Sequence, residues 1–253
     1  MRLSEAIRDA KRRGVTPIIG EVKVRSPRDG DLLGGRDPAT LAEEMVDAGV
    51  IAVSVVTESK HFGGSLEMLH DIRDAIDAPL LRKDFITNED QVHEGKGIDA
   101  LLLICSMLGD PQLQELHLAC LKAGITPLIE VHTENEVLRA NSLRPSLIGI
   151  NNRDIRRLET DGGNVSTTRR LAPLIHKGAV IVSESSITTR AEVEEAIKTG
   201  ADAVLVGTAL LKAVDTKEKV RELLGKSATP RLKSGVSLGD LYEGEGLRDN
   251  KRC

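Results

Sequence analysis

Aromatic residues are nearly absent from this sequence, and their shortage limits how a core can be built. The chain has no tryptophan, and aromatics make up 1% of it. Its three aromatic residues are Phe62, Phe85 and Tyr242. The core must therefore be aliphatic. Because so few aromatic residues exist, the position of each one is informative.

Cysteine is also scarce. Cys105, Cys120 and Cys253 are odd in number and far apart in the sequence. This spacing fits neither a disulfide framework nor a zinc site, so we interpret all three as reduced thiols. The 6 histidines show no His-x-x-x-His or carboxylate spacing that is typical of a metal site. We therefore predict that the protein has no metal site.

Neither sign of charge dominates, and no segment is strongly apolar. The chain has 35 basic and 39 acidic residues, without a basic stripe interleaved with aromatics, so it lacks the footprint of a nucleic-acid binder. No apolar run approaches the roughly 20 residues that span a bilayer. The segment from Met1 to Gly14 is charged and amphipathic, without the apolar centre of a signal peptide. We expect no nucleic-acid partner, no membrane association and a location in the cytoplasm.

Length and composition fit one globular domain. Hydrophobic residues make up 40% of the chain and charged residues 29%, which allows a sizeable core. Its 253 residues match the roughly 250 over which an α/β barrel forms one domain. From Gly225 onward, Ser, Gly, Pro and charges replace the periodic apolar residues. We predict a barrel domain over residues 1–224 and a peripheral or flexible tail over residues 225–253.

Short aliphatic runs alternate with longer segments of helical spacing, a pattern typical of βα units around a buried parallel sheet. The predicted strands are Pro17 to Val22, Val53 to Val56, Leu80 to Arg82, Ala100 to Ile104, Thr126 to Glu130, Ile148 to Ile150, Ala179 to Ser183 and Ala203 to Val206. The predicted helices are Pro38 to Ala48, Leu66 to Ile76, Asn88 to Lys96, Pro111 to Ala123, Thr133 to Ala140, Ser166 to Leu174, Thr189 to Thr199 and Thr208 to Val214. Their boundaries carry first-turn prolines (Pro38, Pro111), threonine N-caps (Thr133, Thr189) and glycine stops (Gly124, Gly200).

Such βα units can form either an open doubly wound sheet or a closed barrel. Open sheets usually have fewer strands and a glycine-rich first βα turn. The first turn here, from Lys23 to Gly35, has no G-x-G-x-x-G pattern. We therefore predict an α/β fold of one domain, a (β/α)8 TIM barrel with a short N-terminal helix.

Polar side chains gather where the predicted strands end. In a barrel, catalytic groups lie at the C-terminal ends of the strands and in the loops that follow. The residues at these positions are Glu21, Lys23, Lys83, Glu130, Asn151, Arg153 and Glu184. A single charged residue at a strand end is commonly just solvated. Several strands that end this way at one shared rim favour an active site.

Six motifs, in this order, resemble the indole-3-glycerol-phosphate synthase family. They are Gly20 to Pro27, Thr57-Glu58 with Phe62 to Ser65, Leu81 to Phe85, Leu128 to His132, Ile148 to Asp154, and Val182 to Ser185, which together cover about residues 15–215. The resemblance implies the barrel fold and no cofactor. It also implies a carbon-carbon lyase that closes the ring of 1-(2-carboxyphenylamino)-1-deoxyribulose 5-phosphate, with loss of CO2 and water, in tryptophan biosynthesis.

The resemblance further implies catalytic roles for four residues. Lys83 is the general acid for ring closure and Glu130 the base for proton removal, while Glu21 and Lys23 assist dehydration. A lysine suits acid work when its pKa falls below the usual value of about 10.4. We expect burial or the neighbouring cations Lys23 and Arg153 to lower the pKa of Lys83, while Glu21, Glu130 and Glu184 keep the local charge in balance.

The remaining predicted contacts are with parts of the substrate. They are Arg153 and Ser26 to the anthranilate carboxylate, Asn151 and Glu184 to hydroxyls, Phe62 and Phe85 to the aromatic ring, and Ser185, Ser186, Gly207 and Thr208 to the phosphate. A guanidinium fork matches two carboxylate oxygens. Backbone N–H groups at a helix start favour a phosphate.

Three departures from the family pattern and two alternatives stay open. Ser186 stands where the family usually has glycine, the segment before the first strand is shorter than the family's N-terminal extension, and Arg28 replaces the serine that is common after Ser-Pro. The alternatives are a sugar-phosphate isomerase on the same barrel and a noncatalytic barrel that binds a phosphorylated metabolite. The set of Lys23, Lys83 and Glu130 argues against both, because such isomerases use a different acid and base and a binding module needs neither. The sequence leaves the oligomeric state open.

Overall fold

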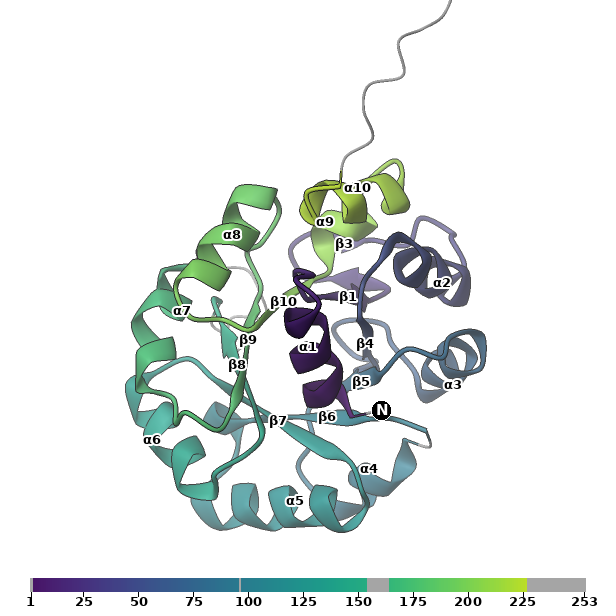
Figure 1. Cartoon of the computed structure of the whole chain (residues 1–253). Coiled ribbons are helices and arrows are strands. Elements are labelled where there is room, and N and C mark those ends of the chain that lie inside the picture. Colours follow the sequence, from purple (N-terminus) through teal and green to yellow (C-terminus); the bar gives the residue numbers. More distant parts are fainter. Residues whose placement is uncertain (1, 96, 154–163, 227–253) are drawn as a thin grey trace, which may run out of the picture.

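Parallel strands close into a barrel (Figure 1). The structure is a computed structural model in which residues 2–95, 97–153 and 164–226 are described. Around the barrel the strands follow the order β1, β10, β9, β8, β7, β6, β5 and β4, and β4 pairs with β1. Their bounds are β1 (Ile18–Val22), β4 (Ala52–Val56), β5 (Leu80–Lys83), β6 (Ala100–Ile104), β7 (Thr126–Val131), β8 (Leu147–Asn151), β9 (Val180–Glu184) and β10 (Ala203–Val206). The predicted (β/α)8 barrel is confirmed.

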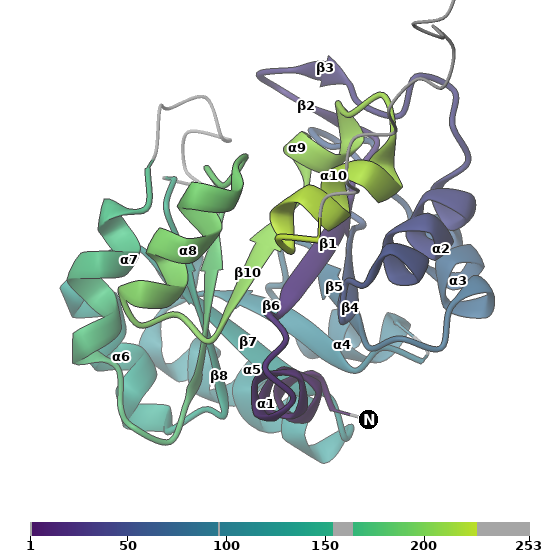
Figure 2. The same cartoon turned by 45° about the horizontal axis from the view of Figure 1, so that its top comes forward.

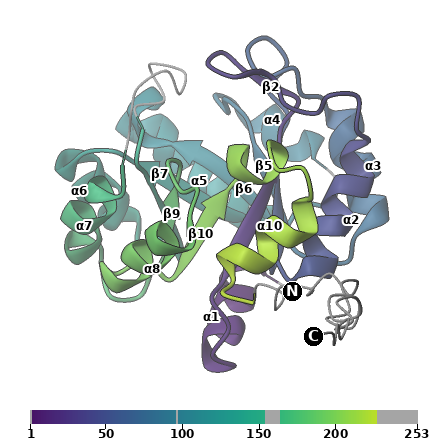
Figure 3. The same cartoon turned by 90° about the horizontal axis from the view of Figure 1, so that it is seen from above.

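Helices cover the outside of the barrel (Figures 1 and 3). Their bounds are α2 (Pro38–Ala48), α3 (Leu66–Ala75), α4 (Glu89–Glu94), α5 (Asp110–Lys122), α6 (Glu134–Leu143), α7 (Ser166–Leu171), α8 (Arg190–Lys198), α9 (Thr208–Leu211) and α10 (Thr216–Leu223), with 3-10 turns η1 (Cys105–Met107) and η3 (Ala172–Leu174). The predicted caps are confirmed, because the Thr133 and Thr189 hydroxyls accept hydrogen bonds from the N–H groups of Glu136 and Glu192. Within the described ranges, no helix has both the length and the apolar character needed to cross a bilayer.

The last predicted helix, Thr208 to Val214, is wrong in its extent. Helix α9 ends at Leu211, and the separate helix α10 begins after Asp215, whose carboxylate accepts the Glu218 N–H at 2.9 Å. Helix α10 packs against α2 and α8 and completes the outer ring (Figure 3). Its buried face holds only Val220 and Leu223 as fully buried apolar residues, which is a weak periodic signal in a charged segment.

The predicted N-terminal helix is confirmed as α1 (Leu3–Arg12). It closes the end of the barrel where the strands begin, because Leu3 and Ile7 are fully buried in the cluster that fills the barrel interior. At the other end of β1 lies an unpredicted hairpin of β2 (Arg25–Ser26) and β3 (Gly30–Asp31) (Figure 2). Helix α1 therefore lies opposite the catalytic end. The predicted tail lies almost wholly outside the described residues, from residue 227 onward, and stays a prediction.

The barrel interior changes from apolar to charged along the strands. Ile19 and Leu81 belong to the apolar interior cluster. Because side chains on a strand alternate between its two faces, the next inward positions are Glu21 on β1 and Lys83 on β5. An aliphatic floor thus supports a layer of charged groups at the C-terminal ends of the strands.

Candidate active site

Inward-facing polar groups from several strands meet at the C-terminal end of the barrel. Lys83 Nζ lies 2.9 Å from Glu184 Oε2 and 3.3 Å from Glu21 Oε2, which joins β5 to β9 and β1. Lys23 Nζ lies 3.1 Å from Glu21 Oε1. The structure therefore brings together the predicted acid and three of its predicted partners.

A second part of this cluster surrounds the predicted base. Glu130 is 1% exposed, and its Oε2 accepts a hydrogen bond from Asn151 Nδ2 at 3.1 Å. Its other oxygen lies 3.4 Å from His132 Nε2. His132 in turn lies 3.4 Å from Glu136 Oε2 through Nδ1, a neighbour that the sequence analysis did not single out. In the sequence, this contact was indicated only by the place of Glu136 three residues after the N-cap Thr133 of α6.

The expected lowering of the Lys83 pKa is wrong. The nearest charges are carboxylates and not the cations Lys23 and Arg153. Burial acts to lower the Lys83 pKa, but Glu184 first, and then Glu21 and the more distant Glu130, outweigh it and raise this pKa well above its ordinary value. Lys83 is therefore an ammonium at neutral pH, with a proton available for donation.

The pKa values of the two carboxylates that hold Lys83 shift in opposite directions. Burial acts to raise the pKa of Glu21, but Lys23 and Lys83 outweigh it and lower this pKa to about 2. Burial raises the pKa of Glu184, and Lys83 acts to lower it. The negative charges of Glu130 and Glu21 add to the effect of burial, so that the Glu184 pKa is raised to about 7. The Oε1 atom of Glu184 has no hydrogen-bond partner among the described residues. The pKa of Glu184 is thus raised to near neutral pH.

Two glycines leave room for these carboxylates inside the barrel. A Cβ atom on Gly149 of β8 would collide with Glu184 Oε1. A Cβ atom on Gly207, just after β10, would lie 2.5 Å from Glu21 Oε1. Real Cβ atoms do not approach other heavy atoms so closely, so both positions help to place the acids.

An apolar pocket opens on one side of the charged cluster. Its apolar lining is Val56, Phe62, Phe85, Leu102 and Ile104, and its polar lining includes Glu21, Lys83, Glu130 and Asn151. Both phenylalanines of the chain therefore lie at the predicted rim. An apolar pocket with a few convergent polar groups is typical of a small-molecule site.

A cationic pocket opens on the other side. Lys23, Arg28 and Arg153 line it together with Ser185, Ser186, Gly207 and Thr208, and Glu21 lines both pockets. The four predicted phosphate contacts thus share one cavity with three positive side chains. Arg28 was noted only as a departure from the family pattern and was not predicted as a site residue.

The turn after β9 has an unusual backbone. Ser185 and Ser186 have φ values of 65° and 57°, in the left-handed region that L-residues seldom adopt. Asn152, which the sequence analysis did not single out, holds this turn by donating from Nδ2 to the carbonyls of Glu184 at 2.9 Å and Ser185 at 3.2 Å. Arg153 Nε donates to Ser186 Oγ at 3.0 Å.

Arg153 and Ser26, the two residues predicted to bind the carboxylate, do not line one common pocket. Arg153 lines the cationic pocket and not the apolar one. Ser26 lines neither pocket, and its hydroxyl accepts the Asp29 N–H at 3.0 Å. Within the described ranges, no group of three or more His, Cys, Asp or Glu side chains is arranged to hold a metal ion.

The family model and the sequence relatives that match this chain name the same family. The family model described as indole-3-glycerol phosphate synthase matches residues 1–223. The indole-3-glycerol phosphate synthase of Pyrococcus furiosus is 43% identical over 224 residues, which cover 88% of this chain and 96% of the relative. That of Kineococcus radiotolerans is 42% identical over 229 residues, 90% of this chain and 82% of the relative. A solved structure, thiamine phosphate pyrophosphorylase from Pyrococcus furiosus, has a TM-score of 0.60 at 15% identity and covers 85% of this chain and 96% of its own, so it shares the fold alone.

Proposed function

Because the chain belongs to the indole-3-glycerol phosphate synthase family, we propose that its two pockets bind the two ends of one substrate. The protein is a carbon-carbon lyase of tryptophan biosynthesis. It converts 1-(2-carboxyphenylamino)-1-deoxyribulose 5-phosphate into indole-3-glycerol phosphate, CO2 and water. The observation that carries the residue assignment is the position of Lys83, which lines the apolar pocket and lies between Glu184 and Glu21, the residue that lines both pockets.

The cationic pocket suits the phosphate end. Its Lys23 and Arg28 side chains, together with the N–H and O–H donors of the Ser185–Ser186 and Gly207–Thr208 turns, complement a dianion. The apolar pocket suits the aromatic end, with Phe62 and Phe85 as its walls. Glu21 lines both pockets, so a substrate that spans them passes directly over the Lys83 ammonium.

The carboxylate and hydroxyls of the substrate need partners between these ends. We assign the anthranilate carboxylate to Arg153, because the planar guanidinium fork matches two carboxylate oxygens. Ser26 joins it only when its hydroxyl leaves Asp29. Asn151 and Glu184 take the hydroxyls, and the unpartnered Oε1 of Glu184 is suited to accept from one.

Ring closure needs an acid beside the substrate ketone. The ring carbon that bears the carboxylate attacks the ketone carbon, and the ketone oxygen takes a proton from Lys83 to become a hydroxyl. The bond to the carboxylate then breaks, CO2 leaves, and the electron pair of that bond restores the aromatic ring. The carboxylates of Glu21 and Glu184 stabilise the Lys83 ammonium beforehand and so keep its proton in place.

Dehydration completes the indole. The new hydroxyl leaves as water, and the neighbouring carbon loses a proton so that a double bond forms between the two. We assign proton removal to Glu130, which Asn151 orients from the adjacent strand. Within the Glu21–Lys23 pair, the Lys23 ammonium donates the proton with which the hydroxyl leaves as water. The cytoplasmic location and the lack of a cofactor remain predictions from the sequence.

The test is product formation from purified protein and the carboxyphenylamino-deoxyribulose phosphate. The chain has no tryptophan, so the rise of indole fluorescence has little protein background. We expect one indole-3-glycerol phosphate and one CO2 for each substrate consumed. Isomerisation of the sugar chain without CO2 release, or binding without turnover, would instead support one of the two alternatives.

A further inference from the structure

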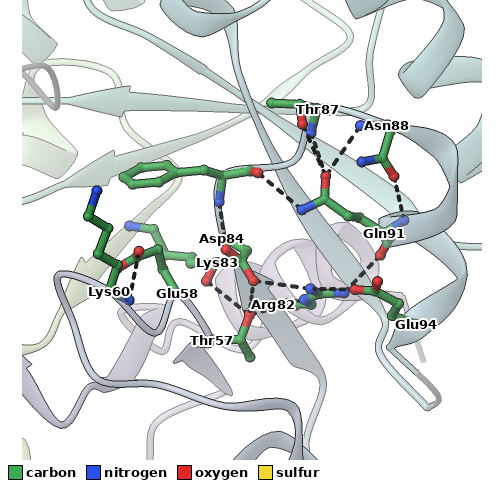
Figure 4. A network of polar contacts seen from close by, with 11 residues as sticks. Thr57, Glu58, Lys60, Arg82, Lys83, Asp84, Thr87, Asn88, Gln91 and Glu94 are labelled. Atoms are coloured by element: carbon green, nitrogen blue, oxygen red, sulfur yellow. Dashed lines mark hydrogen bonds and ion pairs between the residues drawn. The ribbon is translucent and has the colours of Figure 1, made fainter.

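We propose that Thr57 and Asp84 are positioning residues that, through Arg82, fix the backbone on both sides of Lys83. The inference rests on the function proposed above, because its importance depends on Lys83 as the proton donor. Thr57 and Arg82 line neither pocket, and Asp84 lines the apolar pocket but is not assigned to a substrate group. Figure 4 shows the network that they form between strands β4 and β5 and helix α4.

Arg82 is the buried centre of this network. It is 2% exposed and precedes Lys83 on β5, so strand alternation turns it away from the barrel interior that Lys83 enters. Its Nε donates to Thr57 Oγ1 at 3.0 Å, and its Nη1 donates to the Gln91 carbonyl at 2.8 Å. Its Nη2 lies 3.0 Å from an Asp84 oxygen and 3.2 Å from Glu94 Oε2. A buried guanidinium with this many partners is rigidly held.

Asp84 ties the residues that follow Lys83. Its Oδ1 accepts the Phe85 N–H at 2.8 Å, and its Oδ2 accepts the Thr57 hydroxyl at 2.6 Å (Figure 4). Gln91 Nε2 donates to the Phe85 carbonyl at 3.2 Å. The loop after β5 is therefore held at each end of Phe85, the residue that forms one wall of the apolar pocket.

Thr57 joins the two halves of the network. Its N–H donates to the Lys83 carbonyl at 2.9 Å, one residue beyond the last strand pair, Val56 with Lys83. Its hydroxyl donates to Asp84 and accepts from Arg82. Thr57 thus contacts the residues before, at and after the proposed acid, although its own side chain does not line either pocket.

This arrangement matters because the reaction is sensitive to where the Lys83 ammonium lies. A misplacement of about 1 Å can lower a rate by about 100-fold, even when the cause is outside the reacting groups. The groups that face Lys83 are Glu21 from β1, Glu130 from β7 and Glu184 from β9, with Lys23 behind Glu21. If β5 shifts, Lys83 Nζ moves away from these carboxylates and loses the effect that raises its pKa.

The experiment compares Thr57→Val, which is nearly isosteric and removes the hydroxyl, with Thr57→Ser, which retains it. We expect Thr57→Val to lower kcat by about 10- to 100-fold with KM within about threefold of the parent value. Its kcat–pH profile should also lose activity at a lower alkaline pH, because the Lys83 pKa falls. Thr57→Ser should restore both properties. Ile7→Val, in the floor below the barrel, is the control for a small loss of stability far from the rim.

Several results would overturn the proposal. The first is a Thr57→Val variant that keeps the parent kcat. The second is a Thr57→Val variant whose kcat equals that of Ile7→Val when the two have the same unfolding midpoint. The third is a Thr57→Ser variant whose kcat is as low as that of Thr57→Val. If Thr57→Val does not fold, Thr57→Ala, which leaves room for a water, is measured in the same way and judged by the same criteria. Failure of the proposed function is distinguishable, because the parent protein itself would then form no indole.

Discussion

The strained turn after β9 allows a prediction with its own internal control. Ser185 and Ser186 both have positive φ, yet only Ser186 has a hydroxyl that accepts from Arg153 among the hydrogen bonds described here. Replacing either serine with glycine removes the left-handed strain of an L-residue. Only Ser186→Gly also removes the contact with Arg153. The difference between the two variants therefore isolates that hydrogen bond.

The magnitudes follow from opposing effects. Relief of the left-handed conformation is worth about 1–2 kcal/mol for one residue, and the extra chain entropy of glycine in the unfolded state offsets about 0.5–1 kcal/mol of it. Ser185→Gly should therefore stabilise the protein by about 0.5–1 kcal/mol, or raise Tm by about 1–4 °C. Ser186→Gly also loses a hydrogen bond of about 0.5–1.5 kcal/mol, so its net stability should stay near that of the parent.

The same pair should separate in ligand binding. We expect Ser186→Gly to weaken inorganic phosphate binding by at most about tenfold, the equivalent of one hydrogen bond. Ser185→Gly should change phosphate affinity less, because the contact between Arg153 and Ser186 stays in place when the Ser185 side chain is removed. Thermal unfolding and calorimetry with phosphate measure the two effects. Equal stabilisation by both variants, with equal phosphate affinity, would refute a role for the Ser186–Arg153 contact.

Three further predictions concern Glu184, Gly149 and Arg153. The pKa of Glu184 is raised to about 7, so the folded protein binds more protons than the unfolded chain between about pH 4.5 and 7, and its stability should fall as pH rises through that window. Urea unfolding at both ends of the window should show a smaller fall for Glu184→Gln, and equal falls would count against the raised pKa. Gly149→Ala should displace Glu184 and lower stability by about 1–3 kcal/mol together with kcat. Gly109→Ala, where a Cβ meets open space at the N-cap of α5, should leave kcat unchanged and alter stability by less than about 1 kcal/mol; an equal loss of kcat in both variants would reject the steric role. Arg153→Lys should weaken substrate binding more than binding of an analogue without the carboxylate, and equal losses by calorimetry would show that Arg153 contacts another group.

The sequence predicted the architecture better than the electrostatics. Strands such as Ala100 to Ile104 are continuous aliphatic runs, and the hydroxyl caps at Thr133 and Thr189 depend on local spacing alone, so both are legible in the chain. Helix α10 was missed because its burial comes from packing against α2 and α8, which a charged segment does not reveal.

The direction of the Lys83 pKa shift was predicted wrongly for a related reason. The sequence places Lys23 and Arg153 near the rim, but the neighbours of an inward side chain depend on barrel closure. That closure brings Glu21 and Glu184 within 3.3 Å and 2.9 Å of Lys83. The left-handed turn at Ser185 was likewise not predictable, because serine rarely adopts that conformation and Asn152 holds it from the loop after β8.

The central claim, that Lys83 donates the proton for ring closure, is tested most directly by single-turnover kinetics of Lys83→Met. This substitution retains the apolar length of the side chain and removes the ammonium that Glu21 and Glu184 hold. We predict that the variant binds substrate with affinity near that of the parent, while the rate of indole formation falls by about 100-fold or more. A single-turnover rate within about tenfold of the parent, at equal occupancy of the site, would contradict the assignment of Lys83 as the general acid.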